Sequence, residues 1–357
     1  MKNLYALSLD QAVNLVATVG TQRTVLLQGH MGCGKSSTLE TLASMFPDHH
    51  PVYFDCTTKD LGDISIPSLN TDEGYVKYLP NEEFGLHLGK PVILMVDEFG
   101  KANPAVKNAL LRDMLERNRF PEGSIVYATT NLAGEGVGDL LPPHARNRII
   151  TVEIAKPTAE AMLEYGINDG WDLGVLGFIN NFPEVLQSYQ EVPDPESNPY
   201  IFHPKQQRAA FVTPRTLHIA SDTLKMRDSL DDVTAQAALT GCIGQRAAAD
   251  LMSFVKLADQ LPSLESIKQD PDNAKIPTSA SAVGMVVYRA VSLIDKDWVD
   301  AWLRYMMRLD KRWQGFFVNN TVRSAKYNQD KKNVLVTNAR FTKWCTENGY
   351  MFAADKV

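Results

Sequence analysis

The chain has 357 residues, which at ~150 residues per domain indicates about two domains. Hydrophobic residues make up 44% and charged residues 22%, so collagen-like, mucin-like and wholly disordered classes are excluded. The 36 Lys and Arg residues against 42 Asp and Glu residues give a net charge of −6. This charge argues against a protein that coats nucleic acid or an anionic membrane through bulk electrostatics.

Cysteine usage and hydropathy predict the compartment. The four cysteines lie far apart and form no C-x-x-C pair, which favours reduced thiols: Cys33, Cys56, Cys242 and Cys345. The apolar stretch from Val92 stops at Asp97, far short of the ~20 residues of a membrane helix. Asp10 falls where a secretory signal needs an apolar run. We therefore expect a soluble, cytoplasmic protein with no membrane association.

The first 156 residues alternate between apolar strand candidates and helical patterns. Short apolar runs predict five buried strands, at 24–28, 51–56, 91–98, 124–131 and 148–154. Helix-like spacing of apolar residues occurs at 8–19, 35–46 and 105–118. Strands that alternate with helices are typical of a parallel sheet covered on both faces. The predicted fold class is therefore α/β, with residues 1–156 as its core.

The remainder of the chain has a different composition. Six prolines within residues 183–214 break regular structure and predict an ordered loop or an insertion at a domain joint. Helical spacing resumes at Thr213, and the polar, proline-punctuated residues 262–280 indicate a linker. We therefore divide the rest of the chain into a proline-rich connection with a helical lid, 157–262, and a linker with a helical C-terminal extension, 263–357.

The most specific motif is GHMGCGKS, residues 29–36, called the phosphate loop below. It matches G-x-x-x-x-G-K-[ST], with a predicted strand before it and a predicted helix after it. Such glycines let the backbone fold around phosphate oxygens, to which N–H groups and the helix N-terminus present positive potential. Lys35 is expected to reach the β- and γ-phosphates of ATP, and Ser36 to bind Mg²⁺. The predicted nucleotide-binding residues are Gly29, His30, Met31, Gly32, Cys33, Gly34, Lys35, Ser36 and Ser37.

Polar residues also follow two later strand candidates. Asp97 and Glu98 end the apolar run VILMVDE, and ligands collect at the carboxyl ends of strands in an open α/β sheet. Asp97 is therefore expected to assist Mg²⁺, which leaves Glu98 free to polarise the attacking water. Asn131 ends the next strand candidate, where it can hydrogen-bond the γ-phosphate or the water. The acidic pair separates a hydrolase from a protein that only binds nucleotide.

Taken in chain order, these residues resemble the AAA+ ATPases, and more closely their MoxR-like, dynein-related branch. Over roughly residues 8–220, DEFGKANP resembles the family's DEINRA-type box, LPPHARNRI its LPEAQLDRF-like segment and TPRT its SPRA-like motif. The resemblance implies the sensor 1 role for Asn131, the sensor 2 role for Arg215 and an arginine finger at Arg148, with Arg146 as the second candidate. It also implies that the family's helix insertion corresponds to residues 74–89.

The same resemblance implies an ATP- and Mg²⁺-dependent homo-oligomeric ring, usually a hexamer. An arginine that cannot reach its own nucleotide must come from a neighbour, and such a head-to-tail contact closes as a ring or continues as a filament. Nucleotide would then lie between core and lid, and hydrolysis would move the lid and so remodel a partner protein. MoxR-like ATPases resemble chaperones, frequently with a von Willebrand A-domain partner.

Two alternatives remain open at the level of the sequence. Residues 303–343 carry a local charge of +8, and basic residues with aromatic neighbours can bind single-stranded nucleic acid. Aromatic residues in and directly beside this C-terminal stretch include Trp313, Phe316, Phe317, Tyr327 and Trp344. The favoured interpretation is a solvated helix face with its aromatic residues in the core. The other alternative is a nucleotide-switched, non-catalytic scaffold, which the presence of Glu98 and Arg148 opposes.

Overall fold

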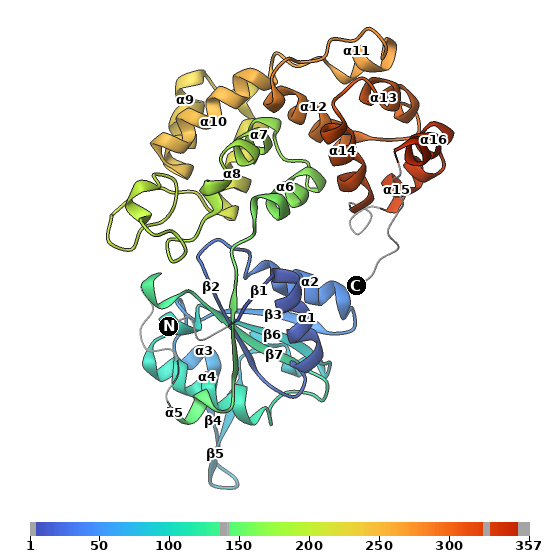
Figure 1. Cartoon of the computed structure of the whole chain (residues 1–357). Helices are drawn as coiled ribbons and strands as arrows, with labels where there is room; N and C mark the ends of the chain where they lie inside the picture. The colour runs from blue at the N-terminus through green and yellow to red at the C-terminus, as the bar shows by residue number, and fades with distance from the viewer. Residues whose placement is uncertain (1–4, 136–140, 142, 324–328, 349–357) are drawn as a thin grey trace. The chain divides into compact units, whose positions relative to one another are not determined.

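The computed structural model describes residues 5–135, 141, 143–323 and 329–348 (Figure 1). The chain divides into two compact units, Met1–Pro157 and Thr158–Val357. The first unit combines strands and helices, whereas every regular element described in the second unit is helical. This arrangement confirms the predicted α/β class of the core and the helical character of the rest.

A parallel sheet forms the centre of the first unit. Within the described residues it has six strands, in the order β1-β8-β2-β7-β6-β3. Their bounds are β1 Ala6–Leu7, β2 Val25–Gly29, β3 His50–Asp55, β6 Val92–Asp97, β7 Ile125–Thr130 and β8 Ile150–Ile154. All neighbouring pairs are parallel, and each of the five predicted strands is present. The chain adds β3, β6 and β7 on one side of β2 and then crosses to β8 on the other, so a switch point lies at β2.

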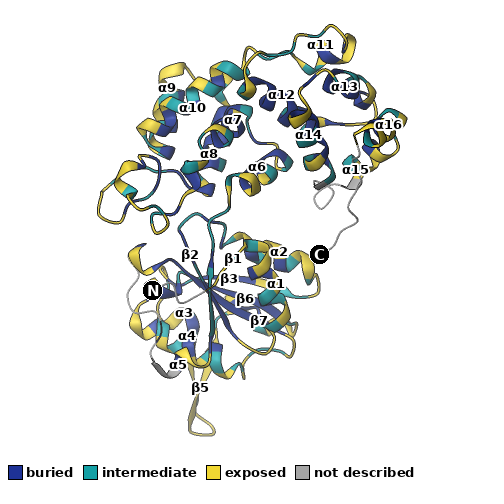
Figure 2. Cartoon of the chain, in the orientation of Figure 1, coloured by how far each residue is buried: buried dark blue, intermediate teal, exposed yellow. Residues whose placement is uncertain are grey.

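Helices cover both faces of this sheet because successive strand side chains point to opposite sides. On one face, Leu27, Met95 and Tyr127 pack with residues of α1 (Leu9–Val19) and α2 (Ser37–Met45). On the other face, Leu26, Leu94 and Val126 pack with residues of α4 (Pro104–Glu116). Figure 2 shows the strands as the buried centre of this unit. Two further short helices are α3 (Leu61–Ile64) and α5 (Pro143–Arg146).

A second, smaller sheet follows α3. Strands β4 (Ser65–Asn70) and β5 (Tyr75–Pro80) pair antiparallel, with Ser65 opposite Pro80. Almost all of their residues are exposed, as the yellow hairpin in Figure 2 shows. Residues 74–89, where the resemblance implies an insertion, form β5 and the 3₁₀ turns η1 (Glu82–Phe84) and η2 (Leu86–Leu88). Two further 3₁₀ turns of this unit are η3 (Phe99–Lys101) and η4 (Ala133–Glu135).

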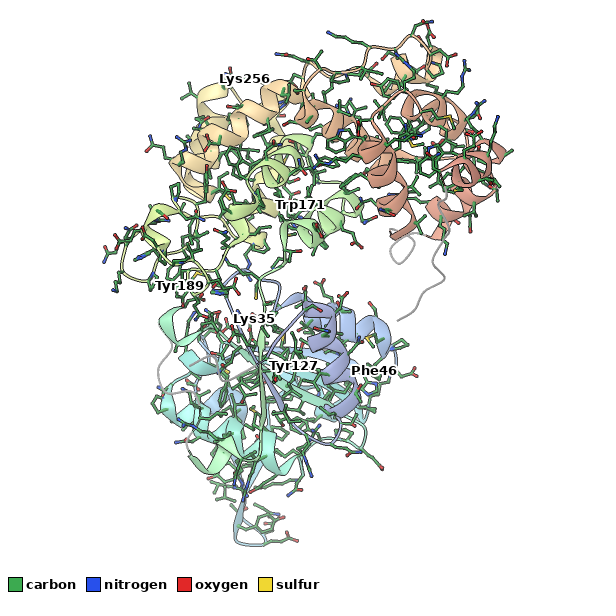
Figure 3. All side chains as sticks on the ribbon, in the orientation of Figure 1. Lys35, Phe46, Tyr127, Trp171, Tyr189 and Lys256 are labelled. Carbon is green, nitrogen blue, oxygen red and sulfur yellow. The ribbon has the colours of Figure 1, made fainter. Side chains whose placement is uncertain are left out.

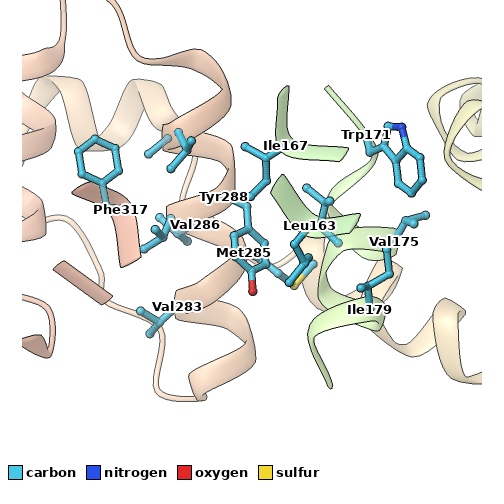
Figure 4. Packing of buried hydrophobic residues seen from close by; sticks show 14 of the residues in the cluster. Leu163, Ile167, Trp171, Val175, Ile179, Val283, Met285, Val286, Tyr288 and Phe317 are labelled. Atoms are coloured by element: carbon cyan, nitrogen blue, oxygen red, sulfur yellow. The ribbon is translucent and has the colours of Figure 1, made fainter. Parts of the chain in front are cut away.

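The second unit is built from helices around one continuous hydrophobic cluster that runs from Met162 to Trp344. In Figure 4, Leu163 and Ile167 of α6 lie against Met285 and Tyr288 of α12. Helices on both sides of the expected boundary at 262–263 contribute to the cluster. The helices are α6 Ala159–Asn168, α7 Leu173–Asn181, α8 Pro214–Lys225, α9 Asp232–Ile243, α10 Gln245–Ala258, α11 Leu264–Gln269, α12 Ala280–Leu293, α13 Val299–Met306, α14 Lys311–Arg323, α15 Gln329–Val336 and α16 Ala339–Glu347.

The proline-rich segment 183–214 has little regular structure beyond the 3₁₀ turns η5 (Pro183–Leu186) and η6 (Pro195–Ser197). Side chains hold it in place instead. The Arg208 guanidinium donates to the carbonyl oxygens of Asn198 and Ile201, at 2.7 and 2.6 Å. A third 3₁₀ turn, η7 (Arg227–Ser229), follows α8. None of the helices in the described part of the chain has the length and apolar character needed to cross a membrane.

Candidate active site

The phosphate loop connects the end of β2 to the start of α2, as the motif predicts. Gly34 has φ +96°, in the left-handed region that a side chain disfavours. At Gly29 a Cβ atom would lie 3.2 Å from the Cys33 sulfur and 3.2 Å from the Ile154 Cβ, so a side chain would force these neighbours to shift by a few tenths of an ångström. The backbone path of the loop therefore favours glycine at both positions.

Lys35 is buried inside this loop. Its Nζ donates to the carbonyl oxygens of Gly29 and His30 and to Oδ1 of Asn131, each at 2.8 Å. An ammonium group has three donors, so all three are used. Figure 3 shows Lys35 at the end of the sheet where the phosphate loop emerges, with Tyr127 within the sheet. The lysine charge is thus held at the carboxyl end of the strands.

Asp97, the last residue of β6, lies beside Ser36 of the phosphate loop. Its Oδ2 is 3.5 Å from the Ser36 hydroxyl oxygen and accepts a 2.8 Å hydrogen bond from the Tyr53 hydroxyl of β3. Its Oδ1 accepts from the Thr129 hydroxyl of β7. Burial raises the pKa of Tyr53, and the hydrogen bond to Asp97 raises it further. This phenol therefore remains a donor.

Glu98 follows Asp97 in a left-handed conformation, with φ +52°. A non-glycine residue in this region costs about 1–2 kcal/mol, and such strain clusters at functional sites. The turn brings Oε1 to 3.2 Å from the Asn131 amide nitrogen, which donates to it. Oε2 forms an ion pair with Lys101 Nζ at 3.1 Å. Glu98 is therefore held at the edge of the site, where its side chain is one quarter exposed.

Asn131 connects the two halves of this arrangement. Its amide oxygen accepts from Lys35 while its amide nitrogen donates to Glu98, so both ends of the amide are used. The side chain is buried directly after β7, the strand between β2 and β6. The structure thus brings together Lys35, Ser36, Asp97, Glu98 and Asn131 from three separate segments of the sequence.

Glu135 is a further member of the site that belongs to none of the predicted motifs. Its carboxylate lies 2.7 Å from His30 Nδ1 and accepts a 2.8 Å hydrogen bond from the backbone N–H of Met31. The Glu135 side chain is only 1% exposed, and that of His30 5%. Because 104 residues separate Met31 from Glu135, no local spacing could have indicated this contact.

Glu135→Ala is expected to loosen the phosphate loop, because it removes a buried acceptor from the Met31 N–H and a partner from His30. Loss of such a partner lowers the free energy of unfolding by about 1–3 kcal/mol. The control is Glu122→Ala at an exposed loop position, which should change the free energy of unfolding by less than about 0.5 kcal/mol. Urea unfolding followed by far-ultraviolet circular dichroism measures the difference. Tryptophan fluorescence does not report on this unit, because all five tryptophans lie in the second: Trp171, Trp298, Trp302, Trp313 and Trp344. Equal stability of the two variants would show that Glu135 does not hold the loop.

Two other loop residues have modest roles. Cys33 is buried, and burial raises the pKa of its thiol, which stays neutral although Lys35 partly opposes the shift. Ser37, the first residue of α2, is exposed and donates through its hydroxyl to the Gly34 carbonyl oxygen at 2.7 Å. Neither side chain reaches Asp97 or Glu98 through a described hydrogen bond.

The predicted arginines are not part of this cluster. Arg148 is exposed and precedes β8, which pairs with β2 so that Ile150 lies opposite Val25 and Ile154 opposite Gly29. Arg148 is therefore at the amino end of the sheet. The phosphate loop lies at the opposite end, and the four residue steps from Ile150 to Ile154 alone separate the two ends by about 13 Å. Arg146 is also exposed and donates to the Leu141 carbonyl oxygen at 2.8 Å. Arg215 is exposed at the start of α8 and is described with the second unit alone.

The oxygen atoms of this site suit Mg²⁺ better than a metal ion whose ligands all come from protein side chains. Among the described residues, no three His, Cys, Asp or Glu side chains group together to hold an ion. Mg²⁺ takes oxygen ligands, and it is usually bound through one or two carboxylates with waters and substrate phosphates. The Ser36 hydroxyl and Asp97 Oδ2, 3.5 Å apart, offer such oxygens beside the phosphate loop. These two residues would hold the ion.

No protein-family model and no curated protein matches the chain. Among solved structures, it is similar to a Cytophaga hutchinsonii protein described as a "putative ATPase", with 20% identity and a TM-score of 0.34 over 45% of this chain and 50% of that one. It is also similar to PCH-2 of C. elegans, with 14% identity and a TM-score of 0.31 over 69% and 68% of the two chains. The chain thus spans half the length of the first protein. Similarity at this level carries no activity over to this chain, which leaves the residues of the site as the basis for a function.

Proposed function

We propose that the chain is an AAA+ ATPase of MoxR-like type that hydrolyses ATP to ADP and phosphate. The observation that carries the proposal is the convergence of Lys35, Asp97, Glu98 and Asn131 at the carboxyl ends of β2, β6 and β7. A loop for phosphate, an oxygen pair for Mg²⁺ and an acid for water are the parts that phosphoryl transfer to water requires. Surface residues without a shared function would not be expected to bring all three of these parts together.

Binding would begin at the phosphate loop. The N–H groups of residues 32–37 and the start of α2 supply positive potential, and Lys35 adds a full charge. Because the three donors of Lys35 are already paired, the ammonium would exchange a carbonyl or amide contact for the β- and γ-phosphate oxygens. Mg²⁺, when bound at Ser36 and Asp97, would supply positive charge that offsets the negative charge of the phosphate oxygens.

Hydrolysis would follow at Glu98. In this step a water oxygen bonds to the γ-phosphorus, the bond from phosphorus to the ADP oxygen breaks, and Glu98 takes up a proton of the water. Asn131 already contacts Glu98 and Lys35, so it can hold the water and the γ-phosphate in line between them. The Lys101 ion pair with Glu98 must yield enough for one carboxylate oxygen to face that water.

The remaining role falls to arginine. An arginine side chain stabilises the negative charge that develops in the transition state of phosphoryl transfer. Neither Arg146 nor Arg148 is positioned at the phosphate loop of its own unit. We assign the finger to Arg148 of a neighbouring subunit in a homo-oligomeric ring, a hexamer by family resemblance, with Arg146 as the alternative. Arg215 would act as sensor 2 from the helical lid. The client would be a protein, with a von Willebrand A-domain protein as a candidate partner, and the ring would act as a cytoplasmic chaperone.

The C-terminal stretch favours a packed role over nucleic-acid binding. Trp313, Phe317 and Trp344 are buried, and Phe316 packs against the same hydrophobic cluster, so these rings are not available for base stacking. Tyr327 lies outside the described residues. Ion pairs also use part of the basic charge, since Arg304 pairs with Asp272 and Arg340 with Asp300. A nucleic-acid-directed motor therefore remains only the second reading, and a non-catalytic scaffold the third.

Glu98→Gln is expected to separate binding from turnover. The amide keeps the shape of the side chain but cannot accept the water proton, so turnover should fall about 10²-fold or more while ATP binding persists. Phosphate release and equilibrium binding of a fluorescent ATP analogue measure the two quantities, with the exposed Glu122→Gln as the matched control. The variant should also retain the client in a pull-down. Loss of ATP binding in Glu98→Gln would mean that Glu98 holds the loop or the metal instead.

A further inference from the structure

We propose that Tyr53 is a positioning residue that fixes the orientation of Asp97 for Mg²⁺, a role that rests on the proposed ATPase function. Asp97 lies between two neighbouring strands, and each strand supplies one hydroxyl to it. Thr129 of β7 donates to Oδ1, and Tyr53 of β3 donates to Oδ2 at 2.8 Å. Each of the two carboxylate oxygens of Asp97 thus accepts a hydrogen bond from a different neighbouring strand.

The sheet register explains how a residue of β3 reaches this position. Asp55 lies opposite Asp97, and Tyr53 lies opposite Met95, two residues earlier. Side chains two residues apart on a strand point to the same face, so Tyr53 is on the face of the sheet that carries Asp97. Asp55 itself is engaged elsewhere, because it accepts from the backbone N–H and hydroxyl of Thr57. The Tyr53 hydroxyl is therefore the group that β3 contributes to Asp97.

Packing alone gives no reason for a tyrosine here. The Tyr53 residue is 51% exposed, whereas its β3 neighbours Val52 and Phe54 are buried in the core. The hydroxyl group makes a part-buried hydrogen bond with Asp97. The side chain therefore contributes more to the site than to the hydrophobic core.

The contact matters because of which oxygen it holds. The terminal torsion of an aspartate is broad, so one hydrogen bond on Oδ1 leaves Oδ2 able to swing. Oδ2 is the oxygen that faces Ser36, and these two oxygens are the ones assigned to Mg²⁺. Groups that orient a metal ligand by hydrogen bonding typically change metal affinity 10–100-fold when they are removed. Tyr53 would accordingly set how strongly Mg²⁺ couples to nucleotide.

The test is Tyr53→Phe in the full chain, which removes only the hydroxyl. A fluorescent ATP analogue is titrated at saturating Mg²⁺, in EDTA, and as a function of Mg²⁺ concentration, with Tyr78→Phe on the exposed hairpin as the matched control. We expect the Mg²⁺ concentration for half-maximal tightening to rise at least about 10-fold in Tyr53→Phe, with unchanged affinity in EDTA. Thr129→Val, which removes the other donor, should shift the same quantity.

The outcomes separate this role from the function beneath it. If Mg²⁺ does not tighten nucleotide binding by the unaltered chain, the proposed function itself fails. If it does and Tyr53→Phe behaves like Tyr78→Phe, the positioning role of Tyr53 is wrong. An equal loss of affinity with Mg²⁺ and in EDTA also overturns it, because it places Tyr53 in general support of the loop. Thermal unfolding without nucleotide checks that each variant folds.

Discussion

Arg148→Ala is expected to bind ATP as the unaltered chain does and to hydrolyse it about 10³–10⁵-fold more slowly. Its own phosphate loop remains complete, since Lys35, Asp97 and Asn131 form their contacts without any arginine. Arg148 lies at the opposite end of β8 from the strand residue beside Gly29. The charge that it supplies to the transition state must then act in a neighbouring subunit.

Mixing two inactive variants tests that assignment directly. Arg148→Ala subunits combined with Lys35→Ala subunits should recover part of the activity, because an intact loop can then face an intact Arg148 across an interface. Recovery should depend on protein concentration, as assembly does. Arg146→Ala, mixed in the same way, serves as the comparison between the two candidates. No recovery in rings that light scattering shows to be mixed would move the finger to Arg146 or contradict the ring.

Lys35→Ala is expected to lose both ATP binding and turnover. The substitution removes the buried ammonium and leaves the carbonyl groups of Gly29 and His30 without their donor. Removal of one preorganised donor to a developing charge typically costs about 10²–10³-fold in rate, and here the same group also holds the ground-state phosphates. Phosphate release and binding of a fluorescent ATP analogue give the two quantities.

The matched control for this variant is Lys90→Ala. Lys90 is an exposed lysine in the loop before β6, so its removal lowers the net charge equally without touching the site. We expect it to behave like the unaltered chain. Near-normal turnover in Lys35→Ala would contradict the assignment of the whole active site.

The strands of the core could be predicted from sequence because each is a short apolar run next to a turn signal. The β4–β5 hairpin could not, since Pro67 and Pro80 lie within it and prolines count against a strand. A two-stranded hairpin tolerates them because each of its strands has a free edge. β1 was also missed, because its two residues are too few to show a period.

The site shows the same division between local and tertiary information. Lys35, Ser36, Asp97 and Glu98 were identified because their chemistry is encoded in contiguous motifs. Tyr53 and Thr129 act on Asp97, and Glu135 acts on His30 of the phosphate loop, at sequence separations of 32 to 105 residues. The left-handed backbone of Glu98 is likewise set by the turn after β6 rather than by its residue type. Only the fold brings such partners together.

Mg²⁺-dependent phosphate release by the purified full chain decides whether this cluster hydrolyses ATP. We expect release that requires Mg²⁺, disappears in EDTA and falls to background in Glu98→Gln, while that variant still binds the nucleotide. Phosphate release by the unaltered chain that does not exceed that of Glu98→Gln, under conditions where both bind ATP, would mean that the cluster does not hydrolyse ATP.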